Sequence, residues 1–299
     1  MIKYNKIKKS TIKEKEQRKR TFNGLTAREW TLLSRNVWND LSSRRESHHL
    51  KHGAVFPLKL AERIITIYSK KGDIIFDPFA GTGTTVVAAY NLDRSGIGIE
   101  LVTEFCHIAS NWLKEKKNNL LNDVEKRKLK CQIINDDCRN LKQYFQKNSV
   151  QLSFTSPPYA NFIQRSLIDR NKTHKKSKIV LENKSVVKQY SQMKEDFGNL
   201  DYPLFLKRIK GVLKDNLQIT KPGGYSVWVV KDYRNTGRKM PYIDFHSDLA
   251  SVAKNAGWLY NDLIVWDQNE QRSLVVLGYP SIFYTNQNCS FIVVFRKPK

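Results

Sequence analysis

Short apolar runs alternate with stripes of helical spacing along most of the chain. The runs, several of them rich in Val and Ile, predict strands at 74–77, 96–100, 131–135, 151–155, 225–230, 262–266 and 291–295. The stripes predict helices at 58–68, 84–90, 102–117, 139–145, 202–217 and 245–255. Strands and helices alternate until the last two strands, which no helix separates. The pattern therefore predicts an α/β fold, a doubly wound and mostly parallel seven-stranded sheet with an antiparallel edge hairpin.

The first fifty residues differ from the rest. Nine Lys or Arg and two Glu among residues 1–20, with few apolar residues, predict a basic arm over 1–21. Apolar side chains at helical spacing predict a helical N-terminal extension over 22–50 that packs on the main domain, and they are Trp30, Leu33, Val37, Trp38 and Leu41. The main domain is expected over 51–299. Within it, 160–200 is too long and too charged for a plain connection and is expected to be an insertion.

Residues 73–85 read DIIFDPFAGTGTT, which predicts a strand, a glycine-rich turn and a helix. Glycines let the backbone approach a ligand closely, and the helix start offers free N–H groups. The turn lacks the third glycine of the dinucleotide fingerprint and the GK[ST] of a phosphate-binding loop. Glu100 ends the next strand, where an acid can accept from ribose hydroxyls. The alternatives are a tight connection for the turn and a solvated strand end for Glu100.

Residues 150–159 read VQLSFTSPPY, a strand that runs into two prolines and an aromatic residue. The prolines fix the backbone and remove two N–H donors, so the carbonyls of Ser156 and Pro157 are held rigidly. Tyr159 follows at once. Such a segment suits a site that accepts hydrogen bonds from an amino group and stacks on a flat ring. The alternative is a turn that is merely stiffened by proline.

The two segments together resemble the DNA amino-methyltransferases, which use S-adenosylmethionine. Serine at the first position of SPPY resembles the cytosine-N4 branch, because adenine-N6 enzymes more often carry Asp or Asn there. The resemblance implies a class I methyltransferase fold, and methyl transfer to the N4 amine of a cytosine flipped out of duplex DNA, in a restriction–modification system. Adenine-N6 methylation, methylation of structured RNA and a non-catalytic DNA-binding module remain as alternatives.

The resemblance also implies site residues. The catalytic residues would be Ser156, Pro157, Pro158 and Tyr159. The residues that bind the cofactor would be Phe56, Pro57, Asp77, Pro78, Phe79, Ala80, Gly81, Thr82, Gly83, Thr84, Thr85, Glu100, Asp137 and Thr155. Phe56 and Pro57 belong to an element that the family usually writes H-P-A-x-F-P, and Gly53 here replaces its first proline. Asp137 matches the acid that accepts from the adenine amine, and it is equally expected to cap the next helix.

The formal net charge is +24, from 52 Lys or Arg and 28 Asp or Glu. This excess favours a polyanionic partner, with a merely lysine-rich composition as the alternative. The expected partner is double-stranded DNA, and a cognate restriction endonuclease is a second candidate. Nine basic residues against three acidic ones in 161–195 make the insertion the candidate target-recognition region. Its candidate DNA contacts are Arg165, Arg170, Lys172, Lys175 and Lys176.

Several classes of protein are disfavoured. No apolar run approaches a membrane span and no apolar segment follows the basic N-terminus, so a cytoplasmic protein is expected. The four cysteines form neither a C-x-x-C pair nor a Pro-Cys dipeptide, which disfavours zinc binding, redox chemistry and attack on cytosine C5. The histidines at 48, 49 and 52 lack Cys or carboxylate partners at ligand spacing, so no metal is expected.

Overall fold

The computed structural model describes residues 21–41, 56–118, 128–160, 191, 193–234, 242–274, 276 and 280–299. The helices are α2 (Ala27–Leu33), α3 (Leu58–Tyr68), α4 (Thr84–Asn91), α5 (Thr103–Asn118), α9 (Tyr202–Ile219) and α10 (Phe245–Lys254), with 3₁₀ turns η2 (Cys138–Gln143), η3 (Phe197–Asn199) and η4 (Asn269–Gln271). The strands are β1 (Val37–Trp38), β2 (Ile74–Asp77), β3 (Ser95–Glu100), β4 (Gln132–Asn135), β5 (Val150–Thr155), β6 (Thr220–Val230), β7 (Tyr233–Arg234), β8 (Tyr242–Ile243), β9 (Leu259–Asp267) and β10 (Cys289–Arg296).

One sheet contains eight of the described strands, in the order β1-β9-β10-β6-β5-β2-β3-β4. Its strands run parallel except β10, which is antiparallel to both β6 and β9. The predicted doubly wound α/β sheet with an antiparallel hairpin is therefore confirmed. Two details differ. The antiparallel strand lies inside the sheet, and β1 adds an eighth strand beside β9, where seven strands were predicted.

The N-terminal extension is helical over a shorter stretch than its apolar stripe predicted. Helix α2 ends at Leu33, and none of its residues is buried. Trp38 is buried, but it reaches the core from β1, which pairs with β9 through Val37 and Trp38. The Asn36 carbonyl accepts the N–H of Val265 at 2.8 Å, so the chain extends an open sheet edge there. A helical reading of Trp38 was wrong because strand pairing satisfies this backbone.

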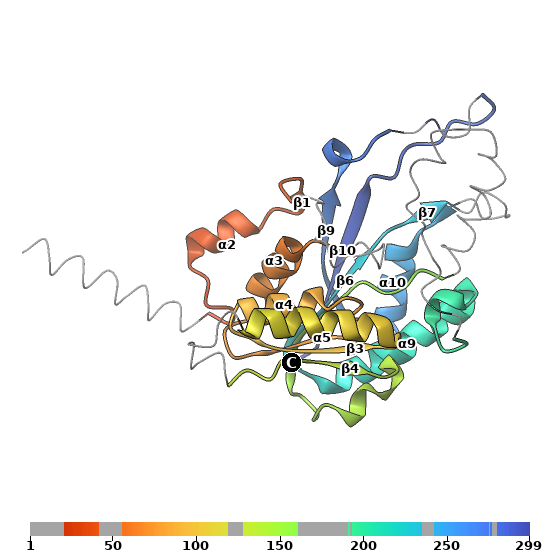
Figure 1. Ribbon diagram of the computed structural model, residues 1–299. Coiled ribbons are helices and arrows are strands. Elements are labelled where there is room, and N and C mark those ends of the chain that lie inside the picture. Colours follow the sequence, from red (N-terminus) through yellow and green to blue (C-terminus); the bar gives the residue numbers. More distant parts are fainter. Residues whose placement is uncertain are drawn as a thin grey trace, which may run out of the picture.

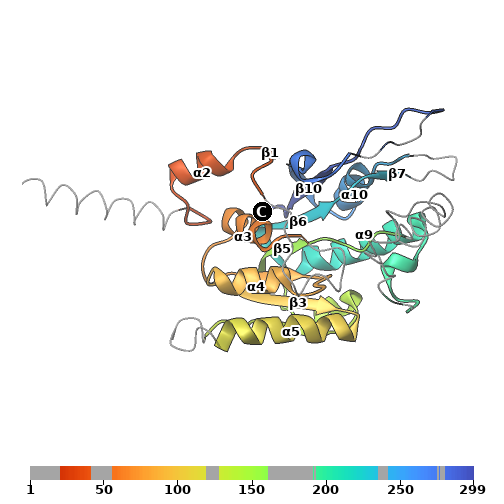
Figure 2. The same ribbon diagram turned by 45° about the horizontal axis from the view of Figure 1, so that its top comes forward.

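Helices cover both faces of the sheet (Figure 1). Side chains of α9 and α10 pack with Phe76, Trp228 and Phe295 in one buried cluster. Side chains of α3 and α4 pack with the other strand faces in a second cluster, and α5 joins α4 in a third. The two groups of helices also lie apart in the turned view (Figure 2). Among the described residues, no helix has the length and apolar character needed to cross a membrane.

The parallel strands all end at one edge of the sheet, which we call the carboxyl rim. Asp77, Glu100, Thr155, Val230 and Asp267 are the last residues of β2, β3, β5, β6 and β9. The loops that follow therefore leave from the same side of the molecule. Ligands of doubly wound sheets bind outside this edge. Segments far apart in the sequence, among them the glycine-rich turn and SPPY, meet here.

Candidate functional site

A pocket opens at the carboxyl rim, with an empty volume of about 700 Å³ that includes space open to solvent. Its lining comes from the loops after β2, β3, β4 and β5 and from the segment before α9. The lining residues are Pro78, Phe79, Gly81, Ile99, Glu100, Leu101, Val102, Phe105, Asp137, Cys138, Ser156, Pro157, Pro158, Tyr159, Glu195, Asp196 and Phe197. Residues expected to bind the cofactor and residues expected to be catalytic thus face one pocket.

Asp77 organises the turn beneath this pocket. Its carboxylate accepts from the hydroxyls of Thr155 at 2.5 Å and Thr85 at 2.6 Å, and from the N–H of Phe79 at 3.0 Å. The side chain is buried, and desolvation raises its pKa to about 6 although these bonds favour the charged form. Asp77 therefore connects the ends of β2 and β5 and the start of α4, and it does not line the pocket.

Glu100 faces the pocket and fixes the glycine-rich turn. One carboxylate oxygen accepts the N–H of Gly81 at 2.7 Å, and the other accepts the N–H of Val102 at 2.8 Å. Burial raises the pKa of Glu100 to about 7, against the pull of these two hydrogen bonds. Each oxygen keeps a further lone pair for a donor from the pocket. Glu100 is thus positioned as a buried hydrogen-bond acceptor whose charged form burial disfavours.

Gly83 closes the turn where helix α4 begins. Its φ of +88° is a left-handed conformation, and a Cβ there would lie 2.8 Å from the Cβ of Ala109. Only glycine meets both demands without strain. Gly98 on β3 is similar, because its Cβ would lie 2.7 Å from the Cβ of Ala80. The glycines of this corner therefore allow α4, α5 and β3 to pack closely behind the pocket.

Asp137 caps the turn after β4, as predicted, and also lines the pocket. It accepts the backbone N–H of Arg139 at 2.8 Å and holds the guanidinium of the same residue at 2.6 Å and 2.9 Å. The segment that follows is the 3₁₀ turn η2 where a helix over 139–145 was predicted, with bonds such as Asn140 N–H to the Asp137 carbonyl at 2.9 Å. Helices with hydrogen bonds between residues three apart are usually only a few residues long.

The apolar wall of the pocket was not predicted from the sequence. Ile99, Leu101 and Val102 flank Glu100 in the sequence, and Phe105 and Cys138 complete the apolar part of the lining. Burial raises the pKa of the Cys138 thiol, which keeps that side chain neutral. One sequence feature could have predicted this wall: the apolar pair Leu101–Val102 directly follows Glu100, although the residues after a strand end are usually polar. A flat apolar ring could lie against this wall.

The segment Ser156–Tyr159 forms the opposite part of the lining. The Tyr159 ring packs edge-on against the rings of Tyr233, at 6.2 Å, and Phe245, at 6.0 Å. These partners come from β7 and α10, so the orientation of Tyr159 is set by elements beyond β5. Phe79, from the glycine-rich turn, packs edge-on against Phe197 at 5.6 Å. Aromatic contacts thus link the two halves of the pocket to the elements around it.

Residues 195–197 also enter the lining, a role that sequence reasoning missed. The predicted insertion over 160–200 covers them, but their segment was considered only for its charge. Asp196 is buried and accepts from the N–H of Gly198 and the hydroxyl of Ser191, both at 2.8 Å. The run DFGN could have been recognised as a capped turn, because Asp two residues before a glycine favours one. This turn holds Phe197 against Phe79.

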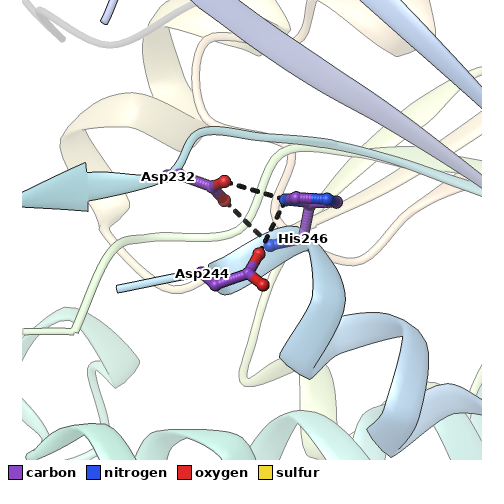
Figure 3. Close-up of side chains that lie close together, drawn as sticks. All are labelled: Asp232, Asp244 and His246. Carbon is purple, nitrogen blue, oxygen red and sulfur yellow. Dashed lines mark hydrogen bonds and ion pairs between the residues drawn. The ribbon is translucent and has the colours of Figure 1, made fainter. Parts of the chain in front are cut away.

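A further polar cluster follows β6 at the same rim. Asp232 is buried and accepts the backbone N–H of His246 at 3.0 Å, while its second oxygen lies 2.8 Å from the Nδ1 of that residue (Figure 3). Asp244 lies 2.9 Å from the same Nδ1. The three side chains are close enough to share a cation. Their mutual bonds already explain the arrangement, which fastens the end of β6 to the start of α10.

Some predicted residues lie outside the pocket lining. Phe56 is buried against the ring of Phe154 at 4.8 Å, and Pro57 precedes α3 as its N-cap. Both therefore serve the packing of α3 in this structure. The other predicted cofactor residues outside the lining belong to the glycine-rich turn or to its supports, and they are Asp77, Ala80, Thr82, Gly83, Thr84, Thr85 and Thr155. The candidate DNA contacts Arg165, Arg170, Lys172, Lys175 and Lys176 lie outside the described residues.

Comparison with known families concerns the first part of the chain. Residues 1–111 match the model of the N6/N4 methyltransferase family, described as DNA methylase. In this region the chain is therefore similar to the N6/N4 DNA methylases. The matched residues include the glycine-rich turn and Glu100 and end before Ser156. The expected resemblance to the DNA amino-methyltransferases is confirmed by this match and by the curated relatives.

Two of these curated methyltransferases show the extent of the match. The orphan methyltransferase M.BamHII of Bacillus amyloliquefaciens is 42% identical over 83 residues, 26% of this chain and 31% of its own. The type II methyltransferase M.MthZI of Methanothermobacter thermautotrophicus is 36% identical over 121 residues, 38% of this chain and 32% of its own. The chain thus matches about a third of the length of these relatives. A solved SAM-dependent methyltransferase of Methanosarcina mazei is 13% identical, with a TM-score of 0.43 over 79% of this chain and 97% of that one.

Proposed function

We propose that this protein transfers a methyl group from S-adenosylmethionine to the exocyclic N4 amine of a cytosine in duplex DNA. One observation carries the proposal: Gly81 and Glu100 line the same pocket as Ser156–Tyr159. A methyl donor and a target amine must meet within one site, and an apolar pocket with a few convergent polar groups is the usual form of a small-molecule site. Because the curated relatives include type II methyltransferases, a place in a restriction–modification system is part of the proposal.

The half of the pocket around Glu100 fits S-adenosylmethionine by its chemistry. Each oxygen of Glu100 retains a lone pair for a ribose hydroxyl. Leu101 and Val102 offer an apolar surface for the adenine ring, and Asp137 can accept from its amine. When bound, the cofactor supplies an electrophilic methyl group on a sulfonium. The residues named here would bind and orient it, and no metal is needed.

The half of the pocket around Ser156 fits the amine. The lone pair of an exocyclic nitrogen is delocalised into the ring, so the nitrogen is a poor nucleophile. The Ser156 hydroxyl and the Pro157 carbonyl can accept the two amine hydrogens and pull the nitrogen toward tetrahedral geometry. Positioning of this kind lowers a barrier by roughly 7–11 kcal/mol at best. Ser156 is a weak base, so the proton leaves to water during or after transfer.

Tyr159 would stack on the target base once it has left the duplex. Extrusion of a base costs a few kcal/mol, which stacking in the site repays in part. The packing of Tyr159 between Tyr233 and Phe245 holds its ring in place before the base arrives. A preset ring loses little conformational entropy on binding. This supports a role for Tyr159 in holding the base, with Ser156 and Pro157 acting on the amine.

The test is incubation of the full chain with labelled S-adenosylmethionine and duplex DNA, followed by nucleoside analysis. We expect label in N4-methylcytosine. Label only in N6-methyladenine would instead establish the adenine alternative, and preferential labelling of total RNA in competition would overturn DNA as substrate. The variants Ser156→Ala and Tyr159→Ala should lose at least about a hundredfold in kcat and still bind the cofactor. Ser34→Ala, an exposed serine at the end of α2, is the control and should keep full activity.

A further inference from the structure

The segment between β9 and β10 carries exposed apolar side chains at the carboxyl rim. β9 ends at this rim with Asp267, and β10 starts back from it at Cys289, so the described residues between them, 268–274, 276 and 280–288, extend beyond the sheet (Figure 1). Among the described large apolar residues, the three most exposed lie on this segment: Leu274 at 76%, Val276 at 79% and Phe283 at 88%. Ile282, beside Phe283, is 55% exposed. Side chains of this kind in water point to a partner surface.

This segment is attached to the proposed active site through a series of contacts. The guanidinium of Arg234 lies over the ring of Tyr284 at 4.5 Å and over the ring of Tyr242 at 5.4 Å. Arg234 also donates to the Thr285 hydroxyl at 3.5 Å. The residue before it, Tyr233, contacts the ring of Tyr159. Phe283 therefore adjoins Tyr284, which is linked to the SPPY segment through Arg234 and its neighbour Tyr233.

The charge around the base of this segment suits a polyanion. Lys231 follows β6 at the rim, and burial together with the charge of Arg272 lowers the pKa of Lys231 to about 8. Arg272 belongs to the exposed segment, so two cations from separate elements approach one another there. A phosphate bound beside these two cations would interact favourably with both. The chain as a whole carries a net charge of +24.

We propose that Phe283, with Ile282 beside it, enters the DNA base stack and fills the gap that the extruded target base leaves. The inference rests on the proposed function, which requires the base to leave the duplex. Apolar wedges such as Phe and Ile are the side chains that proteins insert between base steps. The aromatic ring replaces the stacking that the neighbouring base pairs lose, and Arg272 and Lys231 hold the adjacent phosphates.

The kinetic test compares paired and weakened targets. On a duplex with a mapped cytosine target, Phe283→Ala should lower kcat/KM by about tenfold or more, because aromatic stacking on one base is worth that much. On the same duplex with the target mispaired or opposite an abasic site, the loss should shrink to about twofold, since that base leaves at little cost. Leu32→Ala, an apolar residue of α2 that is 62% exposed, is the matched control and should leave both substrates unchanged. Equal losses on both duplexes, or none, would overturn the inference.

A binding measurement separates this inference from the proposed function. The variant Phe283→Trp carries one more tryptophan than wild type, so subtracting the wild-type emission gives the fluorescence of position 283. We expect this fluorescence to be quenched by stacking on bases when a duplex with an abasic site is added. The signal needs no methyl transfer, so it decides the inference even if the protein methylates no DNA. Unchanged fluorescence on a duplex that is demonstrably bound would overturn it. So would sedimentation that finds a wild-type dimer and a Phe283→Ala monomer, because the surface would then join two copies of this chain.

Discussion

Two buried carboxylates at neighbouring strand ends have different tasks in this molecule. The carboxylate oxygens of Asp77 accept hydrogen bonds from Thr85, Thr155 and the turn backbone. Each oxygen of Glu100 accepts one backbone N–H, and this side chain faces the pocket. Burial raises the pKa of Asp77 to about 6 and of Glu100 to about 7. Their charged forms are therefore held at a cost in the free protein. For Glu100, which faces the pocket, a bound group that donates hydrogen bonds would reduce this cost.

This arrangement predicts how stability depends on pH. A carboxyl whose pKa is higher in the folded than in the unfolded state binds more protons when folded. Its contribution to stability is full below pH 4.5 and is lost as the pH rises toward 7. In Glu100→Gln that loss disappears. We expect the unfolding free energy of wild type to fall by about 2–3 kcal/mol more than that of the variant between pH 4.5 and 7.5, measured by urea unfolding without cofactor.

The control for this prediction is an exposed acid. Glu115 lies on the outer face of α5, where replacement by Gln should leave the pH dependence of wild type unchanged. If the unfolding free energies of wild type and Glu100→Gln changed with pH in parallel, Glu100 would not have the raised pKa that this prediction requires.

A second consequence concerns the cofactor. Its addition at pH 7.5 should stabilise wild type more than Glu100→Gln, because the variant offers one acceptor oxygen instead of two.

Residue-scale reasoning from the sequence located the acids but not their partners. Asp77, Glu100 and Asp137 were found because each follows a recognisable strand, and strand ends are visible in an apolar pattern. The salt bridge of Asp137 with Arg139 and the pairing of Asp232 with His246 were not predicted. The second depends on how β6 meets α10, and such a meeting is set by tertiary packing that one sequence does not reveal.

At the scale of elements, the glycine-rich turn depends on how tightly α5 packs behind it. Gly83→Ala would place a Cβ 2.8 Å from the Cβ of Ala109 and force a non-glycine residue to a φ of +88°. We expect a loss of about 2–3 kcal/mol in unfolding free energy. Because the turn also presents Gly81 to Glu100, affinity for S-adenosylmethionine should fall too. Denaturant titration and calorimetric binding measure the two effects.

Gly211 provides a matched control for this substitution. It lies within α9, its φ is ordinary, and a Cβ there would meet no atom within 4 Å. Gly211→Ala should stabilise the protein by up to about 1 kcal/mol, because alanine is the better helix former. If both variants lose the same stability, the explanation from close packing is wrong, and a general intolerance of the fold to alanine would replace it.

The elements themselves were largely predictable. Besides the 3₁₀ turn η2, one further exception has a clear physical cause. Helix α3 was predicted at its observed bounds, and the seven predicted strands were each found. Six have ends within three residues of the prediction, and β6 begins five residues earlier than predicted. The stripe from Trp30 to Leu41 was read as one helix, yet its second half joins the sheet edge as β1. The apolar spacing of this stripe is compatible with one long helix and also with a short helix followed by a strand. The open edge of β9, which a sequence does not show, decides between them.

At the scale of the whole molecule, the carboxyl rim explains how distant motifs form one site. Parallel strands deliver their loops to one edge, so DPFAGTGTT and SPPY meet although about seventy residues separate them. That meeting was predictable from topology alone. The pocket also receives Glu195–Phe197 from the segment before α9, and the exposed apolar segment before β10 stands at the same edge. Their placement follows from loop conformations, which no pattern in the chain encodes plainly.

The charge of the whole molecule gives the last prediction. If DNA lies against the predicted recognition region 160–200, lysines there release counterions from phosphates, and each contributes about 0.9 to the slope of log K against log salt. The double variant Lys175→Gln, Lys176→Gln should therefore reduce this slope by about 2. An adjacent pair at the opposite edge, Lys70 and Lys71 before β2, is the matched control, and its replacement by Gln should leave the slope within about 0.5 of wild type. Titrations of labelled duplex at 50–200 mM salt measure all three proteins. If the two double variants change the slope equally, the net charge attracts DNA without a particular contact surface. The prediction that residues 160–200 contact DNA would then be wrong.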